Sequence, residues 1–192
     1  MSNTTNLSRE RINTLMHEHV EVCPYDPSWP ACYQEEEILL KRVLPADLVI
    51  RIDHIGSTAV PGLSAKPIID VQVEVRSLER VRQDVVPELE EMGYEFIWRP
   101  TIGEEAPFYA WFIKRDAKGQ RTHHIHMVEP DQASEDRILF RDRLRTHPKD
   151  ALAYERLKAD LAERFPTDRA AYTQGKTDFV TRIIQLARSA GT

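Results

Sequence analysis

A glycine–serine turn followed by a lone aspartate carries the strongest chemical signal in this chain. Gly56 and Ser57 follow an apolar run typical of a β-strand, and Asp70 interrupts the next such run. Backbone N–H groups in a Gly-Ser turn can bind an anion, and a carboxylate on the neighbouring strand can hold a divalent metal ion beside it. The arrangement favours phosphoryl or nucleotidyl transfer and names no substrate. For the Gly-Ser pair alone, an ordinary tight turn is the alternative interpretation.

The strand that carries Asp70 alternates apolar and polar residues. Asp70, Gln72 and Glu74 share one face, because successive side chains of a strand point to opposite sides. A site with two metal ions normally has a second carboxylate two residues after the first, and here that position is Gln72. Asp70 is therefore expected to hold one Mg²⁺ together with water and substrate phosphates. The other interpretation is a polar outer face of an amphipathic strand.

A pair of histidines, His124 and His126, shares one face of a later predicted strand. Imidazoles at this spacing can bind a transition metal, act as a general base or donate to a phosphate, and a purely structural pair is the alternative. His54, directly before the Gly-Ser turn, is one more candidate. We predict Asp70, His124 and His126 as catalytic residues, and Asp70 and His126 as metal ligands.

Three cations are candidates for holding a phosphorylated ligand. Lys66 lies in the loop before Asp70, Arg121 begins the histidine strand, and Lys176 falls on an apolar stripe of a predicted C-terminal helix. The stripe consists of Tyr172, Lys176, Phe179 and Ile183. A lysine there either lies at the edge of the stripe with its ammonium in water or faces a cleft that contains an anion.

The composition of the chain indicates which kinds of partner it can bind and in which cellular compartment we expect it. The chain has 192 residues and a net charge of −5, which favours one domain and argues against extended nucleic-acid binding. Its two cysteines, Cys23 and Cys32, show no zinc-binding spacing and are expected as free thiols. No signal peptide or membrane-spanning run is visible, so we expect a cytoplasmic protein without membrane contact; its oligomeric state is not predictable.

The predicted strands that position these residues concentrate in the first two thirds of the chain, and the last third is predicted to be helical. Strands are predicted at 20–25, 48–55, 67–75, 94–98, 108–115 and 121–128. Helices are predicted at 7–19, 28–44, 77–92, 134–146, 149–165 and 168–189, and a polar loop at 100–107 could border a site. The order predicts an α+β domain over 20–192, with a mixed sheet covered by helices, preceded by an N-terminal tail and helix over 1–19.

Three segments resemble the GrpB family. They are His54–Asp70 (HIGSTAVPGLSAKPIID), His123–Val128 (HHIHMV) and Leu139–Phe179, within a similarity that runs from about residue 20 to 184. The family is similar to the nucleotidyltransferase superfamily of polymerase-β-like fold. The resemblance therefore implies a mixed sheet with flanking helices and a nucleotide or phosphorylated small molecule as ligand.

The superfamily pattern is a Gly-Ser turn, an acid pair on the next strand and a third acid on a later strand. Gly56, Ser57 and Asp70 match it, and Gln72 departs from the acid pair. The departure at Gln72 motivates one alternative to a nucleotidyltransferase, and the group of His124, His126 and Asp70 motivates another. One is a non-catalytic, ligand-binding regulatory module, and the other is a metal-binding hydrolase that depends on its histidines.

Overall fold

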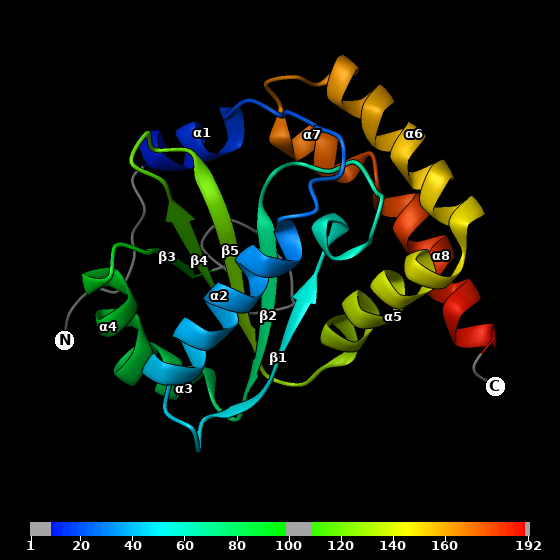
Figure 1. Ribbon diagram of the computed structural model, residues 1–192. Coiled ribbons are helices and arrows are strands. Elements are labelled where there is room, and N and C mark those ends of the chain that lie inside the picture. Colours follow the sequence, from blue (N-terminus) through cyan, green and yellow to red (C-terminus); the bar gives the residue numbers. More distant parts are fainter. Residues whose placement is uncertain (1–8, 99–108, 191–192) are drawn as a thin grey trace.

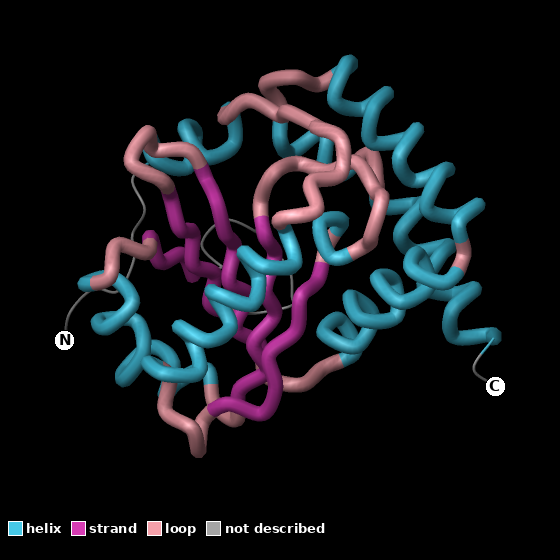
Figure 2. The backbone as a smooth tube through the Cα atoms, in the orientation of Figure 1, coloured by secondary structure: helices cyan, strands magenta, loops and turns pink. Residues whose placement is uncertain are grey.

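A five-stranded mixed sheet forms the centre of the protein in a computed structural model, which describes residues 9–98 and 109–190 (Figures 1 and 2). The strands are β1(Val49–Ile55), β2(Ile69–Val75), β3(Glu95–Trp98), β4(Ala110–Arg115) and β5(Arg121–Val128). Their order across the sheet is β1-β2-β5-β4-β3. β2 and β5 are parallel neighbours, whereas the other adjacent pairs are antiparallel. The mixed α+β class predicted from the sequence is confirmed.

Helices cover both faces of this sheet. They are α1(Arg9–His17), α2(Trp29–Val43), α3(Leu78–Arg80), α4(Val86–Glu91), α5(Gln132–Thr146), α6(Pro148–Arg164), α7(Arg169–Gln174) and α8(Thr177–Ala190), with a 3₁₀ turn η1(Ser57–Ala59) and a π-helical turn η2(Val81–Val85). Figure 1 shows α2, α3 and α4 on one face, and α5 beside β1 with α6 and α8 next to it. Among the described residues, no helix combines the length and apolar character needed to cross a bilayer.

The main core lies between the sheet and the α2–α4 layer. Val71 and Val73 of β2 and Ile125 of β5 are fully buried there, packed with Leu40 of α2 and Leu89 of α4. These strand residues have the parity opposite to Asp70 and His124, so the core face and the chemically active face are the two sides of one sheet. Burial of the apolar side therefore fixes which way the polar side chains point.

Three predicted elements differ from the structure. Residues 20–25 form an isolated bridge between Cys23 and Ala65 rather than a strand. The helix predicted over 77–92 is interrupted by η2, next to Pro87, which cannot donate a backbone hydrogen bond. The helix predicted over 168–189 divides into α7 and α8 at Gly175 and Lys176, so the proposed stripe through Lys176 is not continuous. The loop predicted over 100–107 lies outside the described residues.

Candidate metal and anion site

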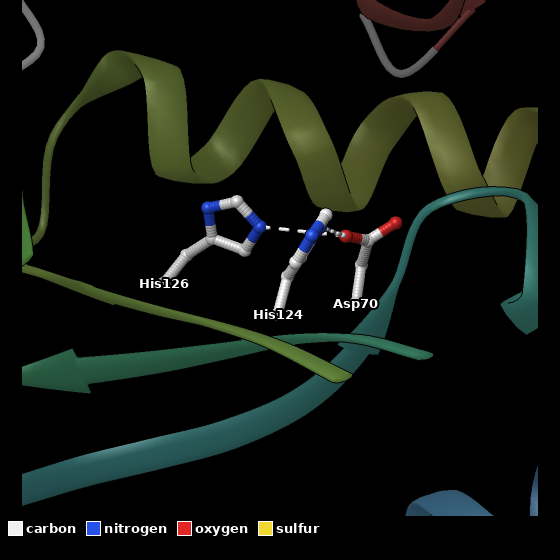
Figure 3. A group of neighbouring side chains, drawn as sticks. All are labelled: Asp70, His124 and His126. Carbon is white, nitrogen blue, oxygen red and sulfur yellow. Dashed lines mark hydrogen bonds and ion pairs between the residues drawn. The ribbon is translucent and has the colours of Figure 1, made fainter. Parts of the chain in front are cut away.

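Asp70, His124 and His126 come together on one face of the sheet. The parallel register pairs Asp70 with His124 and Gln72 with His126, which brings the predicted residues of both strands side by side. His124 Nδ1 lies 3.0 Å and His126 Nε2 3.5 Å from Asp70 Oδ1, beneath α5 (Figure 3). All three donor atoms lie within 4.8 Å of one another. The Asp70 side chain is 30% exposed, so a ligand can reach it.

The Gly-Ser turn packs directly against this carboxylate. Gly56 has φ +72°, and a Cβ atom placed there would lie 2.6 Å from Asp70 Oδ2. Only glycine leaves room for the carboxylate in this conformation. Ser57 follows as the first residue of η1, and its hydroxyl interacts with the phenol of Tyr154. The predicted juxtaposition of Gly56, Ser57 and Asp70 is thus present in the structure.

The charges in this cluster are set by burial and by hydrogen bonds. Burial alone would raise the pKa of Asp70, but hydrogen bonds from His124 and His126 hold that pKa well below its usual range. Burial lowers the pKa of His124 to about 4, although Asp70 opposes the shift. At neutral pH, therefore, an ionised Asp70 accepts a hydrogen bond from a neutral His124.

Arg121 selects the tautomer of that histidine. Its guanidinium Nη1 lies 3.5 Å from His124 Nε2, and a guanidinium can only donate. His124 therefore accepts at Nε2, carries its proton on Nδ1 and donates it to Asp70. This makes His124 an orienting partner of the carboxylate and leaves His126 Nε2 as the nitrogen best placed to bind a metal beside Asp70.

A β-bulge turns Arg121 towards the site. Simple alternation would place Arg121 on the core face with His123 and Ile125. The register between β4 and β5 instead shifts between Lys114 and Arg115, so Thr122 has no partner opposite it. The bulge rotates Arg121 onto the face of His124, where its side chain is only 4% exposed. The predicted role of Arg121 near the site thus depends on an irregularity that the sequence pattern does not show.

Lys66 and Lys176 lie over the same aromatic ring. Their Nζ atoms are 5.2 Å and 4.4 Å from the centroid of Tyr172. Burial, followed by repulsion from Lys176 and Arg169, lowers the pKa of Lys66 to about 7. Burial lowers the pKa of Lys176 to about 8, while Asp70 opposes the shift. Two half-buried ammonium groups beside one ring attract an anion, which would favour their charged forms.

The amide of Gln72 is part of the packing under α5. It is fully buried, donates from Nε2 to the carbonyl of Ser134 at 3.2 Å and accepts from Arg137 Nη1 at 3.0 Å. The polar face of β2 is therefore covered by α5, and its interpretation as a solvent-facing surface is wrong. The residue two positions after Asp70, where the superfamily pattern has a second carboxylate, is thus an amide. Its oxygen and its nitrogen both have hydrogen-bond partners.

His54 does not join the cluster. It pairs with Val71 and so faces the core side of the sheet, where its ring stacks on Tyr33 with a centroid separation of 4.6 Å. His54 Nε2 contacts Thr58 Oγ1 at 3.0 Å, and burial lowers the pKa of His54 to about 4. Its role is to hold the turn that contains Ser57.

Two nearby residues were missed by the sequence reasoning. Trp111 of β4 pairs with His126, and its ring lies 5.0 Å from the ring of His124. The alternation of β4 could have placed it on this face. Arg169, at the start of α7, contributes to lowering the pKa of both Lys66 and Lys176 by charge repulsion. Nothing in the local pattern around Arg169 indicates that α7 packs on α1 and brings Arg169 to Glu18.

These features define a class of protein: an α+β domain with a histidine–carboxylate cluster and a group of cations at one end of two parallel strands. The chain belongs to the GrpB protein family, whose model matches residues 19–186. The family resemblance drawn from the sequence is thereby confirmed.

Known relatives agree with this assignment. The chain is 43% identical to a UPF0157 protein of Pseudomonas aeruginosa, covering 94% of this chain and 73% of that protein. It is similar to the crystal structure of the conserved protein GrpB from Enterococcus faecalis, with a TM-score of 0.73 and 35% identity over 87% of this chain and 96% of the other. It is also 30% identical to a dephospho-CoA kinase of Mycobacterium bovis, covering 85% of this chain but only 45% of that kinase.

Proposed function

We propose that this protein binds a phosphorylated small molecule, with a nucleotide as the leading candidate, at a divalent-metal centre held by Asp70 and His126. The convergence of Asp70, His124 and His126 within 4.8 Å, against the Gly56 turn, is the observation that carries the proposal. His124 orients the carboxylate, as partners of metal ligands commonly do.

The donor set favours a metal that accepts nitrogen ligands. Mg²⁺ prefers oxygen ligands, and the cluster offers it one carboxylate. Zn²⁺ and Mn²⁺ accept an imidazole together with a carboxylate. Mg²⁺ remains the expectation from the sequence, and the donor chemistry supports the nitrogen-tolerant metals more strongly.

The surrounding groups suit a phosphate chain. The turn at Gly56, which continues into Ser57, packs against the carboxylate of Asp70, and Lys66 and Lys176 add positive charge. A phosphate bound to the metal would be aligned by these groups for an in-line displacement, which needs positioning and charge neutralisation more than covalent chemistry. We propose nucleotidyl transfer as the reaction of this site.

Calorimetric titration tests the metal centre first. Chelator-treated protein is titrated with Zn²⁺, Mn²⁺ and Mg²⁺, and then with a nucleoside triphosphate in the presence of each metal. We expect stoichiometric metal binding that falls at least about tenfold in Asp70→Ala and His126→Ala. His123→Ala is the matched control, because His123 lies on the same strand but has the opposite parity. Absence of nucleotide binding with every metal, or undiminished binding in Asp70→Ala, contradicts the proposal.

The buried Gln72 favours a second candidate, a binding module without turnover. Its amide is held by Ser134 and Arg137, so it supplies no charge for a second metal ion. Release of pyrophosphate from a bound nucleoside triphosphate separates the two candidates, since only the transferase produces it. Release of inorganic phosphate alone would instead indicate the histidine-dependent hydrolase.

A further inference from the structure

A cavity lies beside the cluster of Asp70, His124 and His126, at the end of the sheet near α1. Its volume is about 540 Å³, within the range of about 300–1,000 Å³ that is usual for small-molecule sites. It is formed by α1 and the segment after it, the loop before β2, the β4–β5 turn and the start of α7. The phosphate proposed at the Asp70 cluster uses Lys66 from this lining, and the rest of the cavity is available to a different group.

The lining of this cavity is strongly basic. Five basic residues line it, Arg11, Lys66, Arg115, Arg121 and Arg169, against the carboxylates of Glu18 and Glu21 in the lining and of Glu95, which pairs with Arg11 and Arg115. Such an excess of positive charge around a concave surface concentrates anions there.

One carboxylate holds three of these arginines. Glu18 contacts Arg121 Nε at 2.5 Å, Arg115 Nη2 at 2.8 Å and Arg169 Nη2 at 3.7 Å. Guanidinium groups arranged around a single carboxylate present the donor geometry that also binds phosphate or a ligand carboxylate. Glu18 therefore acts as a built-in counter-charge in a site suited to oxyanions.

Lys66 adds a cation whose described contact is with an aromatic ring. Within residues 9–98 and 109–190, no ion pair or hydrogen bond of its ammonium is found, and its contact is with the ring of Tyr172. Burial and the neighbouring cations lower its pKa to about 7, and a bound anion would reverse that shift.

We propose that this cavity binds the oxyanion group, phosphate or carboxylate, of a small metabolite, with Lys66, Arg121 and Arg169 as the donors. Arg121 also contacts His124, so a molecule bound in the cavity lies next to the proposed metal centre. It could therefore be a second substrate, bound beside the molecule that the metal ion holds. Binding in the cavity itself requires no metal ion, because none of the three donors belongs to the metal cluster.

Titration of the full chain in the presence of a chelator tests this assignment. The probes are inorganic phosphate and pyrophosphate, with succinate as the carboxylate. We expect binding of at least one probe at millimolar concentration or below, with shifts of the backbone amide signals of Gly119 and Gln120, which line the cavity. The response to phosphates versus succinate tells which oxyanion is preferred. Absence of binding by all three probes overturns the proposal.

Variants locate the binding. Arg169→Gln should weaken it about tenfold, because one charge-assisted hydrogen bond is lost, whereas Glu18→Gln should strengthen it about fivefold by releasing its arginines. Arg164→Gln, an identical change on an exposed part of α6, is the control and should have no effect. Equal affinity in Arg169→Gln and Arg164→Gln contradicts the assignment.

Two further comparisons keep the test decisive. Arg169 also donates to the carbonyls of Glu18 and His19, so its loss could disturb the fold. Lys66→Gln avoids such contacts and should weaken binding to a similar degree. Asp70→Asn separates this site from the metal centre: it should retain the oxyanion probe while losing the metal. Loss of the probe in Asp70→Asn would show that the cavity has no independent affinity.

Discussion

Gly56→Ala tests whether the Gly-Ser turn positions the metal-binding carboxylate. The backbone at Gly56 has φ +72° and ψ −172°, a region that essentially only glycine occupies, and holding another residue there costs about 1–3 kcal/mol. A methyl group would in addition lie 2.6 Å from Asp70 Oδ2 and 3.1 Å from Asp70 Cβ. The carboxylate must then rotate away from the two histidines that hold it.

The chain offers a matched control for the backbone effect. Gly62 has φ +79°, but no atom lies within 4 Å of the position its Cβ would take, so Gly62→Ala changes the backbone energy alone. We expect Gly56→Ala to lower the free energy of unfolding by about 3 kcal/mol, equivalent to about 6–12 °C in Tm for a chain of this size. Gly62→Ala should cost about 1 kcal/mol, since it meets no steric obstacle.

Metal affinity separates the two variants further. Displacement of the Asp70 carboxylate should weaken metal binding about 10–100-fold in Gly56→Ala and leave it unchanged in Gly62→Ala. Thermal unfolding and metal titration of both proteins are the measurements. Equal losses of stability, together with wild-type metal affinity in Gly56→Ala, would refute the idea that Gly56 packing holds Asp70 in place.

Two further changes probe the surroundings of the site. Gln72→Glu replaces a buried donor to the Ser134 carbonyl with a carboxylate that cannot donate, and should cost about 2 kcal/mol in urea unfolding; an unchanged midpoint would contradict the role of this bond. Burial, and then Lys176, lowers the pKa of Lys158 from 10.5 to about 7, so the unfolded chain binds more protons between these values and stability rises with pH across that window. Lys158→Met should reduce this rise in unfolding experiments from pH 7 to 10; equal slopes in both proteins would show that Lys158 is not responsible.

The cluster was predictable because strand alternation is strict. The parity of Asp70 on one run and of His124 and His126 on another placed each group on a single face, and the parallel register then brought them together. The turn at Gly56 was predictable for the same local reason, since glycine after a strand marks a backbone that other residues avoid.

The cavity could not be predicted from local patterns. Arg121 reaches it through a β-bulge, and Arg169 reaches it because the predicted C-terminal helix breaks and α7 packs on α1. Glu18 follows α1, far from these arginines in the sequence, and its carboxylate pairs with Arg115 of β4, Arg121 of β5 and Arg169 of α7. These contacts depend on how distant segments pack, which neither periodicity nor turn residues encode.

The pairing of β2 with β5 also has a consequence for how the site forms. β1 and β2 make one antiparallel unit and β3, β4 and β5 another, and in the described part of the sheet the two units are joined by the parallel pairing of β2 with β5. Asp70 belongs to the first unit, and His124 and His126 to the second, so neither unit alone contains both of the proposed ligands, Asp70 and His126. Parallel pairing of strands that are distant in sequence is slow to form, because the entropy of the long connecting loop opposes it. We therefore expect the full affinity for a metal ion only after the two halves of the sheet have docked. A bound ion would in turn stabilise the completed fold relative to partly assembled chains.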